Sequence, residues 1–287
     1  MENIRKIKKV IKSKPTMEGA GVRLKRVFGY NEAALMDPFL LLDHFGSDNP
    51  DDYMKGFPWH PHRGIETITY MIHGEVNHED SLGNKGKISA GDVQWMTAGS
   101  GIIHQEMPGA PKNGSNLKGF QLWANLPSTS KMMDPRYQEI KDTDIPVITT
   151  HSGAQVRIIC GKLDGTCGPV SEIVTDPEYM DVHIPAGKEF THFVKKGHTV
   201  FAYVFEGQGY FEKENDTLIK SEELVLFEDG EFIFVKASDR DLRFLLVSGL
   251  PIGEPIAWYG PIVMNYQEEL EKAFQEYRSG TFIKHQQ

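Results

Sequence analysis

The stretch Gly56-Phe-Pro-Trp-His60-Pro-His62-Arg-Gly-Ile-Glu66 carries the pattern that decides the fold, and Gly74 follows it at the next turn. Side chains on a β-strand alternate between its two faces, so residues 60, 62 and 66 share one face if the strand is regular. We therefore expect two imidazoles and a carboxylate to converge on one side of this strand.

A second glycine-rich stretch, Gly99-Ser-Gly-Ile-Ile-His104-Gln-Glu106, offers another histidine and another carboxylate. His104 and Glu106 have the same parity. In a closed barrel, the inward faces of separate strands look at one another across a narrow lumen. The two stretches together predict three histidines and one or two carboxylates meeting in a small β-barrel. The alternative is a pair of packed histidines on a strand, with no metal.

This ligand chemistry limits the choice of metal without deciding it. Neutral imidazole and carboxylate suit Fe, Mn, Ni, Co, Cu or Zn, and the lack of a thiolate argues against a structural zinc site. Four protein ligands would leave two open positions on a six-coordinate ion, which a catalytic metal needs. Four nearby apolar residues are candidates to line a substrate pocket, although core packing explains each of them equally well. They are Phe57, Trp59, Trp95 and Met96.

Short apolar strands separated by turns recur along the chain, for example at residues 67–72 and 199–205. This spacing is typical of a sandwich or barrel, so we expect an all-β fold of two β domains. The proline-containing stretch 125–145 predicts the connection between them. We place the N-terminal metal-binding domain at residues 1–135 and the C-terminal domain at 136–287.

The end of the chain predicts one packing helix. Asn265 and Glu268 resemble a capping box, apolar residues then recur at helical spacing, and Gly280 stops the helix. In the second half, residues 183–193 contain no His-x-His pattern. We therefore expect the C-terminal domain to be metal-free and structural. Isolated histidines, such as His73 and His78, are expected at the surface or in turns.

The composition excludes several classes of function. The 287 residues carry a net charge of −9, so we expect no direct binding of nucleic acid. The basic residues between Arg5 and Lys14 could form an arm, but an edge strand protected by lysines explains them better. No apolar run is long enough to span a membrane, and the charged N-terminus does not resemble a signal peptide. Together with only two cysteines, these features predict a cytoplasmic protein.

Several longer motifs resemble the pirin family of the cupin superfamily. The N-terminal ones are Met36-Asp-Pro-Phe-Leu-Leu-Leu-Asp-His-Phe-Gly46, His60-Pro-His-Arg-Gly64, Thr97-Ala-Gly-Ser-Gly-Ile-Ile-His-Gln-Glu106 and Gln121-Leu-Trp-Ala-Asn-Leu-Pro127. The C-terminal ones are Val204-Phe-Glu-Gly207 and Gly260-Pro-Ile-Val-Met-Asn265. The resemblance spans nearly the whole chain and implies a bicupin, that is, two cupin-type β-barrel or sandwich domains, whose N-terminal barrel holds the metal.

The resemblance also implies a ligand set. In pirins the ligands match His60, His62, His104 and Glu106, and the metal is typically Fe(II). Cupins in general often use the glutamate that matches Glu66. We follow the closer family, so Glu66 becomes a residue that could orient a ligand or bound water. A salt bridge at the end of the strand is the alternative for Glu66.

Two functions follow from the resemblance. Several pirins are similar to quercetin 2,3-dioxygenases, which implies cleavage of a flavonol or related enol by O₂ with release of carbon monoxide. Glu106 would then act as the catalytic base for the flavonol hydroxyl. The alternative is a non-enzymatic iron- or redox-sensing regulator that binds a transcription factor or a metabolic enzyme.

Overall fold

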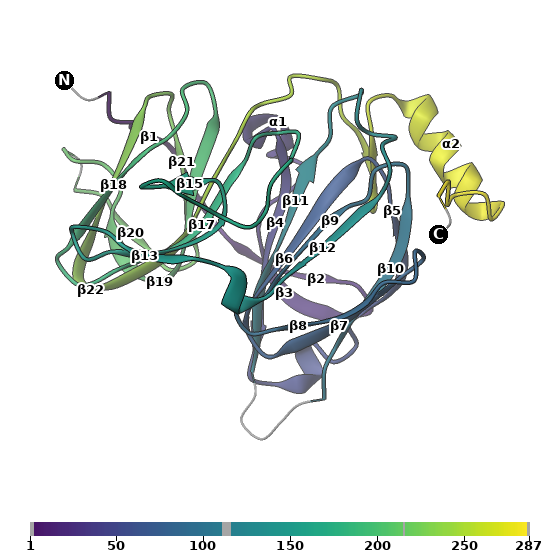
Figure 1. Cartoon of the computed structure of the whole chain (residues 1–287), viewed down its shortest axis with the longest axis horizontal. Helices are drawn as coiled ribbons and strands as arrows, with labels where there is room; N and C mark the ends of the chain where they lie inside the picture. The colour runs from purple at the N-terminus through teal and green to yellow at the C-terminus, as the bar shows by residue number, and fades with distance from the viewer. Residues whose placement is uncertain (1–2, 111–115, 215, 286–287) are drawn as a thin grey trace. The chain divides into compact units, whose positions relative to one another are not determined.

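The computed structural model describes residues 3–110, 116–214 and 216–285, and strands make up most of its regular structure (Figure 1). The predicted all-β class is confirmed. The chain divides into two compact units, and each differs from the predicted domain at one end of the chain: the first residues belong with the second half, and the last residues belong with the first half. Lys14–Asp142 together with Ile252–Gln287 form one unit, called here the N-terminal barrel. Met1–Ser13 together with Thr143–Pro251 form the other, the C-terminal barrel.

Two facing sheets build the N-terminal barrel. The seven-stranded sheet has the order β12-β9-β6-β11-β4-β3-β2, and the four-stranded sheet has the order β5-β10-β7-β8. The strands of the larger sheet are β2 (Lys14–Glu18), β3 (Val22–Phe28), β4 (Phe39–Ser47), β6 (Ile65–His73), β9 (Val93–Thr97), β11 (Leu117–Asn125) and β12 (Arg136–Ile140). Those of the smaller sheet are β5 (Phe57–His62), β7 (Glu75–Asp80), β8 (Lys85–Ser89) and β10 (Ile102–Pro108). Short helical turns of this barrel are α1 (Ala33–Met36) and η1 (Pro50–Asp52), and η2 (Asp142–Asp144) spans the boundary between the two units in the sequence.

Strand β12 corrects the predicted linker. Its residues fall inside the stretch 125–145, which we expected to connect the domains, but they pair along β9 from Arg136↔Thr97 to Ile140↔Val93. Pro127 and Pro135, which precede this strand, suggested a linker, because proline is rare within sheets. Here β12 is an edge strand of the seven-stranded sheet, a position that tolerates such flanking residues.

A sharp turn at Gly64 separates β5 from β6 and corrects the predicted regular strand from residue 60 to residue 66. Gly64 has φ of 78°, a conformation that favours glycine. A Cβ atom at this position would also lie 2.0 Å from the carbonyl oxygen of Val263. His60 and His62 therefore lie on β5 in the smaller sheet, whereas Glu66 lies on β6 in the larger one.

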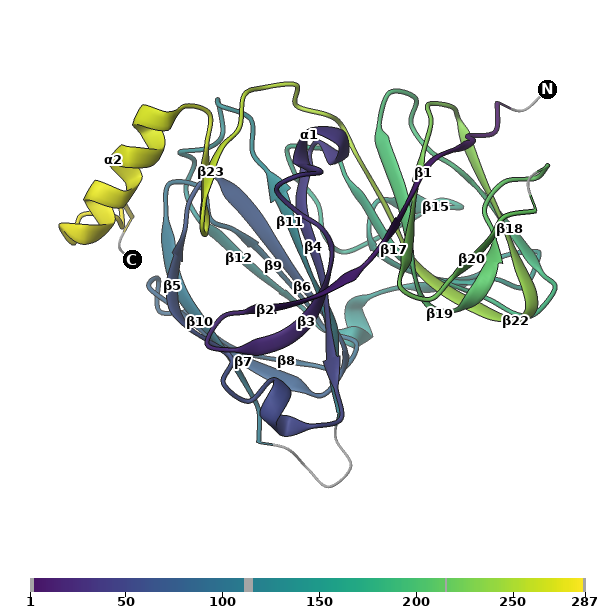
Figure 2. The same ribbon diagram turned by 180° about the vertical axis from the view of Figure 1, so that it is seen from behind.

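The C-terminal segment packs on the N-terminal barrel and contributes β23 (Ala257–Tyr259), β24 (Ile262–Met264) and α2 (Gln267–Arg278). Figures 1 and 2 show α2, in yellow, beside β5. Leu270 and Ala273 of α2 form a buried cluster with Phe282, against which Ile103 of β10 packs. This arrangement contradicts the predicted place of the helix in the C-terminal domain.

The predicted helix exists, but its cap lies one residue later than expected. Tyr266 is the N-cap, and the carboxylate of Glu269 accepts hydrogen bonds from the backbone N–H groups of residues 265 and 266. The side chain of Asn265 instead donates to Glu254 and to the carbonyl oxygen of Pro255. Asn265 therefore ties the tail to the barrel.

The C-terminal barrel contains a nine-stranded sheet that curves around its own apolar core. Its main path is β1-β21-β19-β22-β17-β14-β13, with β18 on β22 and β20 on β19. The bounds are β1 (Ile7–Lys12), β13 (Val147–Thr149), β14 (Gln155–Cys160), β17 (Glu178–Ile184), β18 (Glu189–Phe193), β19 (Thr199–Tyr210), β20 (Leu218–Lys220), β21 (Glu223–Phe227) and β22 (Phe232–Gly249). A separate hairpin joins β15 (Lys162–Leu163) to β16 (Thr166–Cys167).

The basic N-terminal segment is an edge strand, as its lysine content suggested, and not a free arm. β1 pairs antiparallel with β21 at the edge of the sheet. Arg5 is buried and donates to the carbonyl oxygens of Lys195, His198, Glu228 and Gly230. Among the helices that the structure describes, none is long and apolar enough to cross a membrane.

Candidate metal centre

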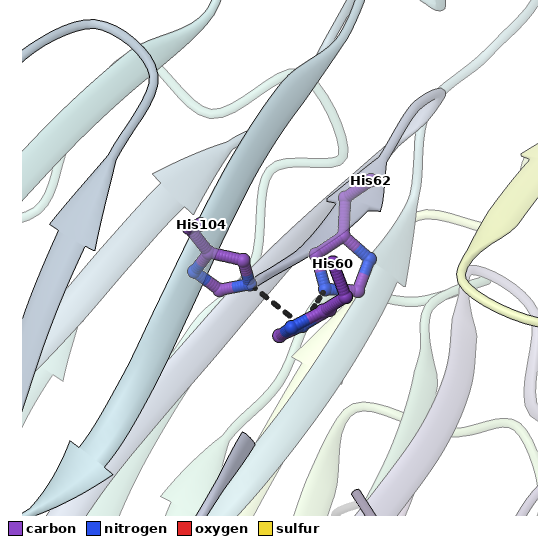
Figure 3. Close-up of side chains that lie close together, drawn as sticks. All are labelled: His60, His62 and His104. Carbon is purple, nitrogen blue, oxygen red and sulfur yellow. Dashed lines mark hydrogen bonds between the residues drawn. The ribbon is translucent and has the colours of Figure 1, made fainter. Parts of the chain in front are cut away.

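Three histidines meet on the inner face of the four-stranded sheet. β5 and β10 are antiparallel neighbours, and their register places His104 opposite His60 and Ile102 opposite His62. The Nε2 atom of His60 lies 3.1 Å from Nε2 of His62 and 2.9 Å from Nε2 of His104 (Figure 3). The strand pairing thus brings together the three imidazoles that the sequence singles out.

Hydrogen bonds at Nδ1, the ring nitrogen away from the triad, fix the tautomer of His60 and His62. Nδ1 of His60 lies 2.8 Å from the carbonyl oxygen of Pro58, and Nδ1 of His62 lies 3.0 Å from that of Pro261. A carbonyl oxygen only accepts, so each Nδ1 carries the proton and donates it. The Nε2 atoms of both rings are then left with lone pairs that point toward the common centre.

Burial keeps the three rings neutral. His62 and His104 are buried, and burial lowers their pKa well below the usual value of histidine, with nearby histidines adding to the effect. Burial also lowers the pKa of His60. Neutral imidazole is the form that binds metal ions. The site is therefore ready to bind a cation at neutral pH.

The nitrogen separations match a metal with right angles between its ligands. Metal–nitrogen bonds of about 2.1 Å at 90° place the nitrogens about 3.0 Å apart, whereas a tetrahedral angle places them about 3.4 Å apart. The separations from Nε2 of His60 to Nε2 of His104 and of His62 are 2.9 and 3.1 Å. Lone pairs this close repel one another unless a cation lies between them, so the residues fit a six-coordinate metal ion better than a tetrahedral zinc.

Glu106 lies close to the histidines but is held in its own position. Its Oε1 accepts a hydrogen bond of 3.0 Å from the hydroxyl of Thr69 on β6. It forms a second possible metal-binding group with His78 and His104, while His60, His62 and His104 form the first. The fourth ligand expected from the resemblance is therefore adjacent to the triad and not equally close to all three rings.

His78 is a site residue that the sequence interpretation missed. It was expected at the surface or in a turn, but it is buried on β7, directly opposite Glu106 in the strand register. Its ring lies between Asp80, whose Oδ2 is 3.2 Å from Nε2, and Gln94, whose Nε2 is 2.9 Å from Nδ1. Its Nδ1 is also 3.5 Å from Nδ1 of His104. His78 therefore contacts the candidate ligand His104 at the ring nitrogen that does not face the triad, where it can orient the ring.

Glu66 faces away from the histidines. The side chain of Thr69 reaches Glu106, so the odd-numbered residues of β6 face the interior of the barrel and Glu66 faces the other side. Glu66 is buried, accepts a hydrogen bond of 2.6 Å from Thr97, and burial raises its pKa. The turn at Gly64 is the reason that neither the predicted second-layer role nor the predicted strand-end salt bridge fits this geometry.

A cavity of about 660 Å³ opens beside the triad inside the N-terminal barrel. Of the four predicted pocket residues, Phe57 lines it. Trp59 is 47% exposed, Trp95 lies on the same face of the sheet as Glu66, and Met96 belongs to a buried apolar cluster. Closeness to the ligands in sequence selected these three. Alternation along the strands directs Trp59 and Trp95 away from the cavity, whereas Met96 shares the inner face with Gln94 and packs within the apolar cluster.

Other aromatic side chains line the cavity instead, among them Trp258 and Tyr259 from the C-terminal segment. Trp123 contacts His62 edge-on with ring centroids 5.0 Å apart, and Trp258 lies 6.0 Å from Trp123. Tyr30, which is 68% exposed, lies 5.6 Å from Trp258. Rings thus continue from a candidate ligand to the surface. The alternation of β11 is the signal that could have placed Trp123 on the cavity face.

Comparisons with known proteins agree with this architecture. The family model named Pirin matches residues 21–124, and that of the pirin C-terminal cupin domain matches residues 179–283. A Pseudomonas aeruginosa protein that carries the provisional name quercetin 2,3-dioxygenase is 45% identical over 93% of this chain and 94% of its own length. A pirin-like protein of Caulobacter vibrioides is 43% identical, covering 97% and 99%.

The fold also agrees with a solved structure. The crystal structure of quercetin 2,3-dioxygenase from Acinetobacter baumannii has a TM-score of 0.90 and 33% sequence identity, and the match covers 97% of this chain and 98% of that one. Both barrels are therefore cupin domains, as the motifs implied. With family matches in both halves and similarity over nearly its full length, the chain belongs to the pirin family.

Proposed function

We propose that this protein is an Fe(II)-dependent dioxygenase of the quercetin 2,3-dioxygenase type, which opens a flavonol or a related enol with O₂. The single observation that carries the proposal is the convergence of three neutral Nε2 atoms at the wall of a largely apolar cavity. The names of the relatives from Pseudomonas aeruginosa and Acinetobacter baumannii support the choice of reaction. Ni, Mn, Co, Cu and Zn remain chemically compatible alternatives to iron.

The residues of the cavity suit the proposed substrate. A bound metal would act as a Lewis acid toward the enol oxygens and would supply the site for O₂ chemistry. The rings of Phe57, Trp123 and Trp258 line the cavity and offer apolar surfaces for a planar aromatic molecule, and they exclude water from its reacting end.

Glu106 is the proposed base for the acidic hydroxyl of the substrate. Thr69 donates to Oε1, which leaves Oε2 of Glu106 able to accept a proton. The carboxylate lines the cavity and shares it with His60 and His62. A proton taken from the substrate would therefore stay within the pocket, beside the atoms that react.

The test is anaerobic loading with Fe(II), quantification of the metal, and then oxygen consumption with quercetin. About one metal per chain, oxygen uptake and release of carbon monoxide are the expected results. His62→Ala should lose metal and keep the all-β circular dichroism spectrum, whereas His73→Ala, at an exposed histidine, is the matched control that keeps both. Glu106→Gln should lose more activity than metal. Undiminished turnover in Glu106→Gln would rule out Glu106 as the base.

A second candidate is a redox-sensing regulator that binds a protein partner, and the aromatic contacts favour it. Rings in contact link His62 through Trp123 and Trp258 to the exposed Tyr30, so a change at the site has a packed route to the surface. Metal binding without oxygen uptake, combined with capture of a partner in one iron oxidation state alone, would favour this candidate over the enzyme.

A further inference from the structure

A row of polar side chains crosses the larger sheet of the N-terminal barrel and is the feature from which this inference is drawn. The strand register places Gln94 opposite Thr69, Thr69 opposite Gln121, Gln121 opposite Asp43, and Asp43 opposite Arg26. These five residues, called here the polar row, occupy five neighbouring strands, β9, β6, β11, β4 and β3. Directly opposed residues share a face, so the row lies on the inner face of the sheet.

The row begins at the candidate metal centre and runs away from it. Gln94 contacts His78, and Thr69 donates to Glu106. At the other end, Arg26 forms a bidentate ion pair with Asp43, in which Nε and Nη2 donate to the two carboxylate oxygens at 2.9 and 2.8 Å. With strands about 4.8 Å apart, the row spans roughly 14 Å from Thr69 to Arg26. A ligand of three linked six-membered rings fits along this length.

Apolar side chains border the row on both sides. Leu24 and Phe45 are paired on one side of it, and Leu41 and Trp123 are paired on the other. These four residues and four members of the row, Thr69, Gln121, Asp43 and Arg26, line the same cavity. The cavity therefore offers one line of hydrogen-bonding groups within apolar surroundings, which favours a flat ligand with polar groups on one edge.

The hydrogen bonds within the row leave acceptors for such a ligand. The hydroxyl of Thr69 has a single proton, yet it lies 3.0 Å from Oε1 of Glu106 and 2.7 Å from Oε1 of Gln121. The conflict disappears if the amide of Gln121 is turned, so that its NH₂ donates to Thr69 and Thr69 donates to Glu106. The amide oxygen of Gln121 is then not used by Thr69 and can accept from a ligand in the cavity that Gln121 and the neighbouring Asp43 both line.

The charges along the cavity select against anions. Three carboxylates line it, those of Glu18, Asp43 and Glu106, against the one guanidinium of Arg26. Arg26 is already engaged by Asp43 and by Glu18, at 2.9 Å. A ligand carboxylate would therefore meet net negative charge and few free donors, whereas ligand hydroxyls would meet acceptors.

We propose that the polar row determines the substrate specificity of the cavity, favouring neutral planar aromatic molecules with hydroxyl groups along the edge away from the metal and rejecting aromatic carboxylates. Gln121 and Asp43 accept hydrogen bonds from these hydroxyls. This inference deepens the proposed function and rests on it for the orientation of the ligand. Its test is binding, which needs no turnover.

The experiment measures affinity by calorimetry in protein loaded with Zn(II), which has no redox chemistry. The ligands are quercetin, the same flavonol without hydroxyls on its pendant ring, and a flavone bearing a carboxylate on that ring. The intact protein should prefer quercetin over the analogue without pendant hydroxyls by about tenfold, the value of one or two net hydrogen bonds. It should bind the carboxylate more weakly than either.

Two substitutions assign the preference to the row. Gln121→Met keeps the volume of the side chain and removes the acceptor. It should therefore weaken the binding of quercetin about fivefold and leave the affinity for the analogue without pendant hydroxyls within twofold. Asp43→Asn should improve binding of the carboxylate several-fold. Gln208→Met, a glutamine on β19 of the C-terminal barrel, is the matched control and should change nothing.

Equal weakening of both flavonols by Gln121→Met, or no preference for quercetin in the unaltered protein, would overturn the inference. The second result needs no variant and so does not depend on the folding of one. If quercetin binds with the expected preference but Fe(II)-loaded protein consumes no oxygen with it, the proposed reaction is wrong and the specificity stands. If quercetin is consumed without any preference in binding, the reverse holds.

Discussion

Replacing Arg63 with methionine should remove the hydrogen bonds that hold the C-terminal segment next to the candidate metal centre. Arg63 directly follows His62 and is buried. Its guanidinium donates to the carbonyl oxygen of Ser100 at 2.7 Å, to Glu276 of α2 at 2.7 Å and to the carbonyl oxygen of Phe282 at 2.8 Å. It also lies 4.2 Å from the centre of the Phe282 ring. Methionine keeps much of the volume and removes all the donors.

Two estimates bound the cost in free energy of unfolding. Removing one partner of a buried ion pair costs about 3–5 kcal/mol. Three hydrogen bonds from a charged donor, at about 1.5 kcal/mol each, give about 4.5 kcal/mol. Lys284 lies 2.9 Å from Glu276 and would still neutralise it after the substitution, so the ion-pair value is an upper limit and the hydrogen bonds carry the estimate. We therefore expect Arg63→Met to lower the free energy of unfolding by about 4 kcal/mol.

A second effect should appear at the metal site. The same segment supplies the carbonyl oxygen of Pro261 that fixes the ring of His62. Loss of such a partner behind a ligand lowers metal affinity by about 10- to 100-fold. Urea unfolding of the metal-free protein measures the first effect, and competition with a chelator measures the second.

The matched control is Arg23→Met, because Arg23 is 70% exposed and pairs with Asp52 at 3.4 Å. An exposed pair of this kind contributes less than about 1 kcal/mol. If Arg63→Met costs no more than this control, or if it leaves chelator competition unchanged, the C-terminal segment does not support the site in the way described.

Two further changes give expected outcomes. Gly64→Ala should destabilise the barrel by more than about 1–2 kcal/mol and displace the segment around Val263, because φ is 78° and the new Cβ would meet the Val263 carbonyl; Gly83→Ala, where φ is also positive but space is open, is the control for urea unfolding. Burial raises the pKa of Asp43 to about 6, although Arg26 opposes the shift. The folded state therefore holds this proton more tightly than the unfolded state, so stability should fall by up to about 3 kcal/mol as the pH rises from about 4 to about 6. Asp43→Asn should remove that part of the slope in urea midpoints measured against pH, and an unchanged slope would contradict the assignment.

Strand alternation predicts much of the candidate site because the residues it concerns lie on separate regular strands. His60 and His62 are two apart on β5, and His104 lies opposite His60 on β10, so parity and pairing suffice to bring the rings together. Parity failed for Glu66 because one glycine with positive φ redirects the chain between two strands. Nothing in the spacing of residues distinguishes a continuous strand from such a turn.

Residues supplied by other strands could not be selected in the same way. Thr69, Gln121 and Asp43 are ordinary polar residues within apolar strands, and only the register of three strands shows that they form one row. Alternation along β11 does place Gln121 opposite in face to Phe120 and Leu122. From the sequence alone, the polar face of this strand is predicted to be exposed to solvent, whereas in the structure it lines a cavity.

The predicted domain division failed for a related reason. Composition marks where regular patterns stop, but it does not show which sheet an end of the chain joins. The stretch 252–287 contains the helix that was expected, and its apolar residues would suit either barrel. Specific contacts decide the outcome, among them Lys131, whose buried ammonium donates to the carbonyl oxygens of Gly64 and Val263.

The position of the C-terminal segment in the sequence determines the order in which the parts of the candidate site are synthesised. A ribosome releases the chain from its N-terminus, so His60, His62 and His104 emerge long before Pro261, which lies 199 residues beyond His62. The three imidazoles can approach one another while synthesis continues, but the carbonyl that fixes His62 and the carbonyl of Phe282 that binds Arg63 arrive last. A message cut short near its end would therefore yield a complete set of histidines in an incomplete site.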